Sequence, residues 1–306
     1  MKIIKRSHID LIVVSTQFQL MNSIELSINH LRSEHIGLIV LHQNVKHKTQ
    51  IYELAQKYNL EILYSVKAKF LIQYIDLFFK ILNITIRYKI NNLIVGHIKN
   101  NMMLFLINNL KFNNLFTVDD GDIFEIKDLR PSIKSKFLPI NFFSIFDLNS
   151  NKYFNFSKNE YIFFKKYRMQ NSNNVLFLGA TFVNQNLLSQ KEYLNFLLKV
   201  IEKEGEIDYF PHPRENDNIF KDIKGLNLIK SNFGIEHFLL DKKKLPKKII
   251  CFYSTSIVSL SVLFKEIKIN IFWIDSRNLF QQRPYHFKKE INYINKKLKI
   301  NKYNIS

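Results

Sequence analysis

The chain has 306 residues, of which 46% are hydrophobic, so it can bury a core in two ordinary α/β domains or in one large one. Its 45 basic residues outnumber its 26 acidic residues, which gives a formal charge of +19. This excess indicates a polyanionic partner, an anionic membrane surface or a basic cleft for anionic ligands. No helix-turn-helix, zinc-finger or RNA-binding signature accompanies the charge, so we do not expect nucleic acid as a partner.

The cysteine content and the length of the apolar runs exclude further classes of protein. Cys251 is the only cysteine, which excludes an internal disulfide and a cysteine-based metal site, and its apolar neighbours predict a buried core residue. No apolar run approaches the roughly 20 residues that a membrane helix needs. Leu11–Val14 is too short for the apolar region of a signal peptide. We therefore expect a cytoplasmic bacterial protein, for which charge would allow peripheral association with the inner face of the membrane.

The first part of the chain alternates apolar runs with amphipathic segments. This alternation is typical of a parallel sheet with helices on both faces. In chain order, strands are expected at residues 9–14, 36–42, 61–64, 93–96 and 115–119, and helices at 17–31, 49–58, 70–88 and 100–110.

A second alternation begins near residue 174, after a stretch without rhythm at 126–171 that we interpret as a domain connection with an acceptor-side segment. Here strands are expected at 174–179, 207–210, 226–230, 248–252 and 269–274, and helices at 190–204, 234–240 and 257–264. The α/β pattern predicts a GT-B architecture, in which two Rossmann-like domains face a central cleft. The expected domains are residues 1–160 and 161–285, followed by a basic C-terminal helix or tail at 286–306.

Two adjacent carboxylates, Asp119 and Asp120, end a predicted strand and precede Gly121. Ligands of open α/β sheets bind outside the carboxyl ends of the strands, so one of these carboxylates could serve as a general base. The alternative is an ordinary Asp-Gly turn facing solvent. Asp120 and Asp122 also have Asp-x-Asp spacing, but no cluster of metal ligands is visible and we expect no metal.

A histidine held between two prolines follows another predicted strand, in the segment Phe210-Pro211-His212-Pro213-Arg214-Glu215. Each proline stiffens the backbone, which would hold the imidazole in place. His212 could donate a hydrogen bond or a proton to a departing phosphate. Arg214 and Glu215 could pair with each other or line the opening of the same ligand site. The alternative is a rigid loop with an incidental histidine.

Hydroxyl side chains connect strands to helices at two further points. Ser254, Thr255 and Ser256 precede an apolar helix, where hydroxyls and free N–H groups form an anion site or simply cap the helix. The segment Ser15-Thr16-Gln17-Phe18-Gln19 could likewise present polar groups to a sugar, or cap the helix that it opens. Glycine-rich dinucleotide and P-loop patterns are missing, as is the Gly-x-Ser-x-Gly nucleophile pattern.

Taken in order, these motifs, together with Phe177-Leu178-Gly179, resemble those of bacterial sialyltransferases, most closely glycosyltransferase family 52. The resemblance covers about residues 11–260. It implies an inverting GT-B enzyme that moves a sialic-acid-like sugar from a CMP-sugar donor to a glycan acceptor of lipooligosaccharide or capsule. It also implies that the chemistry needs no metal or other cofactor, and it is consistent with a homodimer.

The resemblance also assigns roles to individual residues. It makes Asp119 the general base, with Asp120 as the second candidate, and lets His212 contact and protonate the phosphate of CMP. Gly179, Pro213, Arg214, Ser254, Thr255 and Ser256 would bind the nucleotide, and Thr16, Gln17 and Gln19 would lie on the acceptor side. Two alternatives remain open: another GT-B enzyme that uses CMP-Kdo or a UDP-sugar, and a non-catalytic protein that binds polyanions or membranes.

Overall fold

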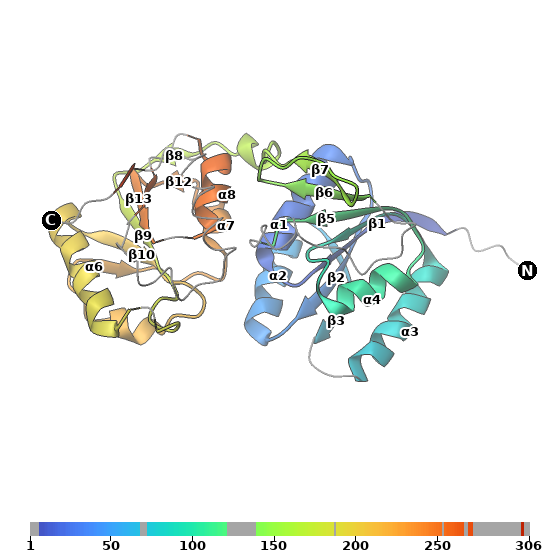
Figure 1. Ribbon diagram of the computed structural model, residues 1–306, viewed down its shortest axis with the longest axis horizontal. Helices are drawn as coiled ribbons and strands as arrows, with labels where there is room; N and C mark the ends of the chain where they lie inside the picture. The colour runs from blue at the N-terminus through green and yellow to red at the C-terminus, as the bar shows by residue number, and fades with distance from the viewer. Residues whose placement is uncertain are drawn as a thin grey trace, which may run out of the picture. The chain divides into compact units, whose positions relative to one another are not determined.

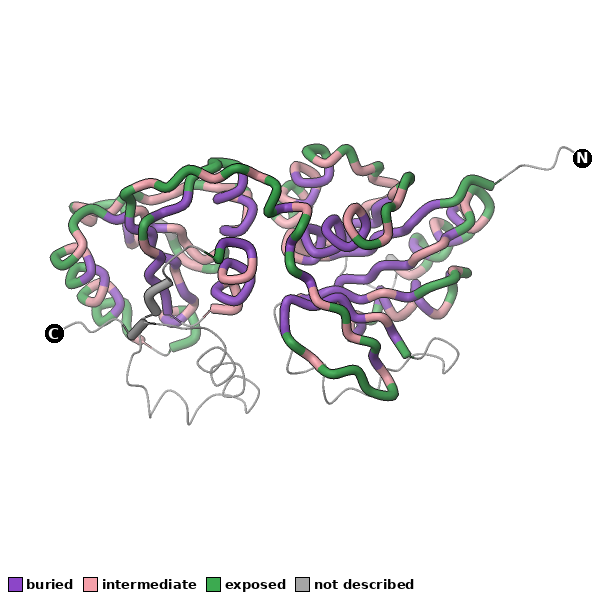
Figure 2. The backbone as a smooth tube through the Cα atoms, turned by 90° about the horizontal axis from the view of Figure 1, so that it is seen from above, coloured by how far each residue is buried: buried purple, intermediate pink, exposed green. Residues whose placement is uncertain are grey.

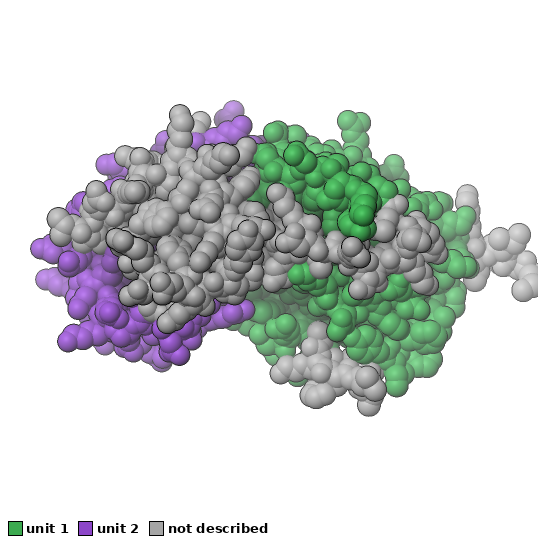
Figure 3. Space-filling model, viewed as in Figure 1, with its two compact units in different colours: residues 1–164 green, residues 165–306 purple. Residues whose placement is uncertain are grey.

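The computed structural model describes residues 6–67, 72–120, 139–186, 188–252, 254–265, 269–271 and 301–302. The chain divides into two compact units, residues 1–164 and 165–306, which are coloured separately in Figure 3. Each unit is built on its own parallel β-sheet.

The first unit has a seven-stranded sheet in the order β3-β2-β1-β4-β5-β6-β7, and all neighbouring strands are parallel. Helices α1 and α2 lie on one face of this sheet, and α3 and α4 lie on the other (Figure 1). The strands are β1 (Ser7–Val14), β2 (Ile36–His42), β3 (Glu61–Lys67), β4 (Tyr88–Val95), β5 (Phe112–Val118), β6 (Ile140–Ser144) and β7 (Phe154–Lys158). The helices are α1 (Gln17–Glu25), continued by a π-helical turn at Leu26–His30, α2 (Val45–Lys57), α3 (Ile72–Arg87) and α4 (Asn101–Asn109).

The core of this unit follows from strands that are apolar on both faces. Leu11–Val14 of β1 and Leu38–Leu41 of β2 are fully buried, as a strand covered by helices on both sides requires (Figure 2). Polar caps start the helices between them. Thr16, Asn44 and Asn100 each accept a backbone hydrogen bond in the first turn of α1, α2 and α4, respectively.

The second unit has a six-stranded parallel sheet in the order β11-β10-β9-β13-β14-β15, and a separate parallel pair, β8 with β12. Aromatic side chains dominate its core, where the rings of Phe177 and Tyr209 stack at 5.6 Å. The strands are β8 (Gln170–Asn171), β9 (Val175–Leu178), β10 (Ile207–Phe210), β11 (Leu226–Leu228), β12 (Lys244–Leu245), β13 (Lys248–Cys251), β14 (Ile269–Ile271) and β15 (Asn301–Lys302). The helices are α6 (Gln190–Glu204), α7 (Ile235–Lys242) and α8 (Ser256–Leu263), with short 3-10 turns at Phe164–Lys166 and Asp217–Phe220.

Both sheets reverse their strand order at the same point. In the first sheet the order changes direction between β1 and β4, and in the second between β9 and β13. The carboxyl ends of strands beside such a reversal form the usual ligand crevice of an open α/β sheet. Thr16 follows β1, Gly179 follows β9 and Ser254 follows β13, whereas Asp119 and His212 follow β5 and β10, each one strand away from the reversal.

The expected strands and helices are present, with ends shifted by a few residues, and the last expected strand is described only as far as Ile271. The predicted burial of Cys251 is confirmed, and burial raises the pKa of its thiol. The strand expected at 93–96 begins earlier, at Tyr88. The prediction missed its first half because exposed and half-exposed polar side chains there interrupt the apolar run that indicates a buried strand.

One expectation was wrong. The stretch 126–171 is not only a connection, because its described part contains β6 and β7, which extend the first sheet. Asparagine and serine interrupt the apolar residues of both strands, so neither has the continuous apolar run that predicts a central strand. In the segment expected as a basic C-terminal helix or tail, 286–306, the described residues 301–302 form β15 and pair with β14. Gly121, Asp122, Tyr253 and the rest of the tail lie outside the described residues.

Replacing Phe142 by alanine tests the newly found part of the sheet. Phe142 of β6 is fully buried and packs 5.3 Å from the ring of Phe156 on β7. We expect Phe142→Ala to reduce stability by about 3–5 kcal/mol, because a large buried ring leaves a cavity. Thermal unfolding followed by circular dichroism measures the loss. Phe79→Ala, at a ring that is 64% exposed, is the control and should change little; equal effects would contradict the assigned packing.

Candidate functional site

Asp119 directly follows β5, and its carboxylate is buried rather than exposed. Its side chain is 1% exposed and accepts hydrogen bonds from the Ser144 hydroxyl at 2.8 Å and the Ile145 backbone N–H at 2.6 Å. Burial raises the pKa of Asp119 to about 7, although these two hydrogen bonds oppose the rise. The carboxylate thus connects the ends of β5 and β6, and the Asn22 amide of α1 donates to the Asp119 carbonyl at 3.2 Å.

Asp120 is the carboxylate of this pair that solvent reaches. Its side chain is 23% exposed, and the Gln19 side-chain amide donates a hydrogen bond to its Oδ1 atom. The other oxygen, Oδ2, lies 3.8 Å from Nδ1 of His97, which directly follows Gly96 at the end of β4. Asp120 therefore has one oxygen held in place and a histidine beside the other.

Gln19 is fully buried and reaches across the end of the sheet to hold Asp120. Its Oε1 atom accepts a hydrogen bond from the Ser15 backbone N–H at 2.7 Å, so both ends of the amide are engaged. Gly96 makes room for it, because a Cβ atom there would lie 2.1 Å from the Gln19 Oε1 atom. Gln19 thus lies behind Asp120 rather than on the surface.

The other two residues expected on the acceptor side also make local contacts. Thr16 caps α1 by accepting the Gln19 backbone N–H at 3.2 Å. The Gln17 amide donates to the Gln50 carbonyl of α2 at 3.2 Å, which ties the starts of the two helices together. Both side chains are half-buried.

His212 follows β10 in the second unit, and its ring is neutral at physiological pH. Burial, with a smaller contribution from the nearby charge of Arg214, lowers the pKa of His212 to about 4. The Arg214 backbone N–H donates to His212 Nδ1 at 3.2 Å, so the ring proton resides on Nε2. The loop therefore presents an imidazole N–H donor, flanked by the exposed Pro213 and Arg214.

Glu215 turns inward and holds the histidine loop. Its carboxylate accepts hydrogen bonds from the His212 backbone N–H at 2.6 Å and from the Tyr209 hydroxyl at 2.8 Å. The Tyr209 hydroxyl lies 2.9 Å from that of Tyr193. Burial raises the pKa of Glu215 to about 7, against the lowering effect of these hydrogen bonds. Glu215 therefore forms hydrogen bonds with His212 and Tyr209 in place of the expected pair with Arg214.

Gly179, at the end of β9, is needed for this arrangement. A Cβ atom at this position would lie 2.0 Å from the Glu215 carboxylate and 2.8 Å from the His212 backbone nitrogen. The Gly179 N–H donates to the Phe210 carbonyl at 2.8 Å. The glycine thus allows the histidine loop to pack against the neighbouring strand end.

The three hydroxyl residues begin α8 after β13, and each is half-buried. Ser254 accepts the Ser256 backbone N–H through its hydroxyl at 3.3 Å, whereas Thr255, the N-cap residue, makes no side-chain capping bond. The buried carboxyl of Glu236 accepts hydrogen bonds from the hydroxyls of Ser259 and Ser256. Ser256 is thus directed inward, while Ser254 and Thr255 lie at the positive end of the helix.

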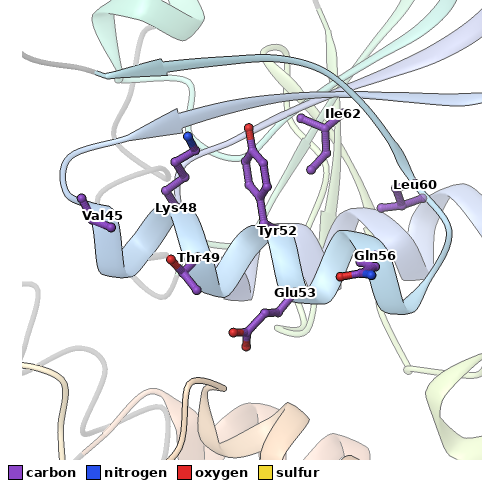
Figure 4. Close-up of a pocket in the computed structure, with 8 residues that line it drawn as sticks. All are labelled: Val45, Lys48, Thr49, Tyr52, Glu53, Gln56, Leu60 and Ile62. Carbon is purple, nitrogen blue, oxygen red and sulfur yellow. The ribbon is translucent and has the colours of Figure 1, made fainter.

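A groove of about 600 Å³ lies between α2 and the edge strand β3 (Figure 4). The Lys48 ammonium lies 5.1 Å from the centre of the Tyr52 ring, and Glu53 adds a carboxylate. Aromatic faces and charged groups of this kind can bind sugar rings and their hydroxyls. The lining residues are Val45, Lys48, Thr49, Tyr52, Glu53, Gln56, Leu60 and Ile62.

Within the described ranges, no group of three or more His, Cys, Asp or Glu side chains could hold a metal ion. Among those same residues, no helix combines the length and apolar character needed to cross a membrane.

Comparison with solved structures identifies the architecture. The α/β-galactoside α-2,3-sialyltransferase of Photobacterium phosphoreum matches with a TM-score of 0.56 over 97% of this chain and 99% of that one, at 12% identity. The chain has the GT-B fold. The expected fold class of two Rossmann-like domains is thereby confirmed.

Other GT-B structures with different activities match nearly as well. A UDP-GlcNAc 2-epimerase of Methanocaldococcus jannaschii gives a TM-score of 0.54 at 15% identity, over 86% of this chain and 83% of that one. One of Neisseria meningitidis gives 0.51 at 8% identity, over 95% and 92%. No protein-family model and no curated protein sequence matches the chain. At these identities the comparisons show the fold alone.

Sequence reasoning missed several residues that the fold brings to these strand ends. His97, Ser144 and Asn22 surround the two aspartates, and Tyr193 and Tyr209 support Glu215. The position of His97 directly after an expected strand was the one available signal. The other residues are ordinary polar or aromatic side chains whose proximity arises only from folding.

The buried carboxyl of Glu215 predicts a pH-dependent stability. Its pKa is about 7 in the folded protein against 4.5 as the ordinary value, so the folded state holds a proton that the unfolded chain releases. This contribution to stability is present below pH 4.5 and is lost as the pH rises to about 7, by at most about 3 kcal/mol. We expect Glu215→Gln to reduce the fall in melting temperature across this pH range without abolishing it, because the pKa of Asp119 is also raised to about 7.

Melting curves of wild type and variants, recorded by circular dichroism at several pH values, measure this slope. The exposed Glu202 on α6 supplies the matched control, and Glu202→Gln should keep the wild-type slope. A Glu215→Gln protein with an unchanged pH slope would show that Glu215 is not the proton-binding group.

Proposed function

We propose that the protein is an inverting glycosyltransferase that moves a sialic-acid-like sugar from a CMP-sugar to a hydroxyl of a bacterial surface glycan, either lipooligosaccharide or capsule. The observation that carries the proposal is the chemistry of the two sheet edges. One presents a half-exposed carboxylate, Asp120, and the other presents an imidazole donor, His212, after β10 and hydroxyls at the start of α8, after β13. A sialyltransferase fold that spans almost the whole chain supports it.

Asp120 is the general base in this proposal. A base must touch the acceptor hydroxyl, and of the two aspartates only Asp120 has a side chain that solvent reaches. Gln19 holds one oxygen of Asp120, and the other oxygen, Oδ2, which lies beside His97, would face the acceptor hydroxyl. Asp119, which the motif order made the first candidate, is a positioning residue that joins β5 to β6.

His212 and the start of α8 receive the leaving group. His212 donates from Nε2 to a phosphate oxygen, and the phosphate charge would raise the imidazole pKa from its low resting value toward proton transfer. Ser254, Thr255 and the α8 N-terminus bind the same phosphate through hydroxyls and backbone N–H groups. Gly179, Pro213 and Arg214 line the nucleotide side, as does Ser256, whose hydroxyl is hydrogen-bonded to Glu236.

The reaction is a single displacement. The acceptor oxygen forms a bond to the anomeric carbon as its proton passes to Asp120, and the bond from that carbon to the phosphate oxygen breaks. The electron pair leaves with CMP, whose phosphate accepts a hydrogen bond from Nε2 of His212. Attack on the face opposite the leaving group inverts the anomeric centre, and developing charge on the phosphate is met by fixed donors. The proposal requires no metal cofactor.

The acceptor approaches along the first unit. Thr16 and Gln17 shape the end of β1, and the groove between α2 and β3 offers the Tyr52 ring and the Lys48 ammonium to a sugar (Figure 4). Gln17 connects the two, since its amide binds the α2 backbone. Gln19 acts on the acceptor only through Asp120.

Conservative substitutions distinguish the proposed roles of Asp119 and Asp120. We expect Asp120→Asn to lower kcat by about 10²–10⁴-fold, because an amide cannot accept the proton. Asp119→Asn keeps an oxygen for the Ile145 N–H and should lose far less activity, mainly through stability. Steady-state rates and melting temperatures of both variants test this. A larger kcat loss in Asp119→Asn, with unchanged melting temperature, would make Asp119 the base.

A donor screen tests the transfer itself. Incubation with CMP-sialic, CMP-legionaminic or CMP-pseudaminic acid and a simple galactoside should give a glycosylated product and CMP, detected by mass spectrometry. His212→Ala should lower turnover by about 10²-fold or more, because the phosphate loses its donor. Turnover should persist after treatment with a chelator.

The alternative donors are tested by thermal shift with CMP, UDP and GDP. Stabilisation by UDP alone would favour a UDP-sugar enzyme and contradict the proposed donor, and use of CMP-Kdo would change the sugar. The lack of binding or turnover of any nucleotide sugar would favour a non-catalytic protein.

A further inference from the structure

One face of α3 is apolar and exposed. Five large hydrophobic side chains point outward from this helix, at positions three or four residues apart, and together form what we call the α3 stripe. It extends about 16 Å at 1.5 Å per residue. Its members are Ile75 (59% exposed), Phe78 (44%), Phe79 (64%), Leu82 (44%) and Ile86 (59%).

The α3 stripe is a second apolar face of a helix that already has one. Leu77, Ile81 and Ile84, on the opposite side, are buried against the first sheet. In the described residues only three other large hydrophobic side chains are comparably exposed, on separate elements: Val45, Ile162 and Leu198. A contiguous exposed stripe of this kind marks an interaction surface, whereas single exposed hydrophobic residues do not.

Basic side chains gather where the stripe ends. Ser7 of β1 pairs with Tyr88 of β4, and Ile90 of β4 pairs with Phe112 of β5. The residues next to these pairs therefore lie together at the amino-terminal edge of the sheet, beside the last turn of α3. They form an exposed group that we call the basic edge: Arg6, Arg87, Lys89 and Lys111.

Acidic groups do little to offset this charge. Asp76, near the start of the stripe, is paired with Lys80 at 2.6 Å. Asp10 at the start of β1 is buried and accepts hydrogen bonds from Asn92. The exposed Glu34 and Glu61 precede β2 and begin β3, on the side of the sheet away from β4 and β5.

We propose that α3 lies flat in the surface of an anionic lipid membrane, with the α3 stripe in the acyl boundary and the basic edge on the headgroups. Phenylalanine, leucine and isoleucine on one helix face, with arginine and lysine beside them, form the pattern of an interfacial helix. An anionic leaflet attracts the basic edge, and the chain's formal charge of +19 adds to this attraction. A second copy of the chain would instead bring like charges together.

The surface is separate from the proposed chemistry. Asp119, Asp120 and Gln19 lie at the carboxyl edge of the sheet, whereas the basic edge lies at its amino-terminal edge. Membrane binding therefore does not depend on the proposed reaction, although a lipid-linked acceptor would make it useful. Membrane binding and sugar transfer can be measured independently.

Sedimentation with vesicles tests the proposal. The full chain should bind vesicles of phosphatidylcholine that contain about a third phosphatidylglycerol, and bind pure phosphatidylcholine much more weakly. Phe78→Ser combined with Phe79→Ser should weaken binding by about tenfold or more, through lost apolar burial. Arg87→Ala combined with Lys89→Ala should weaken binding to anionic vesicles by about fivefold per charge, and added salt should do the same.

Leu198→Ser is the matched control, because Leu198 is a single exposed leucine (50%) on α6 of the second unit, and it should bind as wild type does. Unchanged melting temperatures would confirm that the variants are folded. Full vesicle binding by the Phe78/Phe79 variant would overturn the proposal. So would a wild type that ignores vesicles but forms an oligomer that this variant loses in light scattering, since a second copy would then cover the stripe. Turnover of a CMP-sugar in solution reports on the proposed function separately.

Discussion

The parallel pairing of β1, β4, β5 and β6 is the constraint on which the candidate functional residues of the first unit depend. Since all strands run the same way, the residues after β1, β4, β5 and β6 converge on one edge although they are widely separated in sequence. The buried Asp119 carboxylate fixes this edge by accepting from both Ser144 and Ile145. The buried carboxylate holds the ends of β5 and β6 in register. The next residue, Asp120, has the side chain that solvent reaches.

The same device recurs in the second unit with different residues. A glycine at a strand end admits a polar side chain that in turn holds a functional group: Gly96 admits Gln19, which holds Asp120, and Gly179 admits Glu215, which holds His212. In both units a missing Cβ atom creates the space, and a buried hydrogen bond fills it. Such supporting contacts keep a functional group near one orientation, which is what transition-state stabilisation requires.

Burial sets the protonation of these groups. Desolvation disfavours the charged form, so it raises the pKa of Asp119 and Glu215 and lowers that of His212. In the absence of ligand, the second unit therefore presents a neutral imidazole backed by a carboxyl group that titrates near neutral pH. An anionic nucleotide would add the charge that this site lacks. The overall positive charge of the chain fits both an anionic donor and an anionic membrane surface.

The sequence by itself determined the α/β class, the central strands and most helices, because continuous apolar runs and helical spacing report burial directly. It also located the motifs at strand ends. It could not identify β6, β7 and β15, whose polar or short segments become strands only when a neighbouring edge is available for pairing. Tertiary structure alone decided that Asp119 is buried and Asp120 half-exposed, that Gln19 and Glu215 face inward, and that His97 stands beside Asp120. The physical reason is that adjacent residues at a strand end point in different directions, and only the packed neighbours determine which of them meets water.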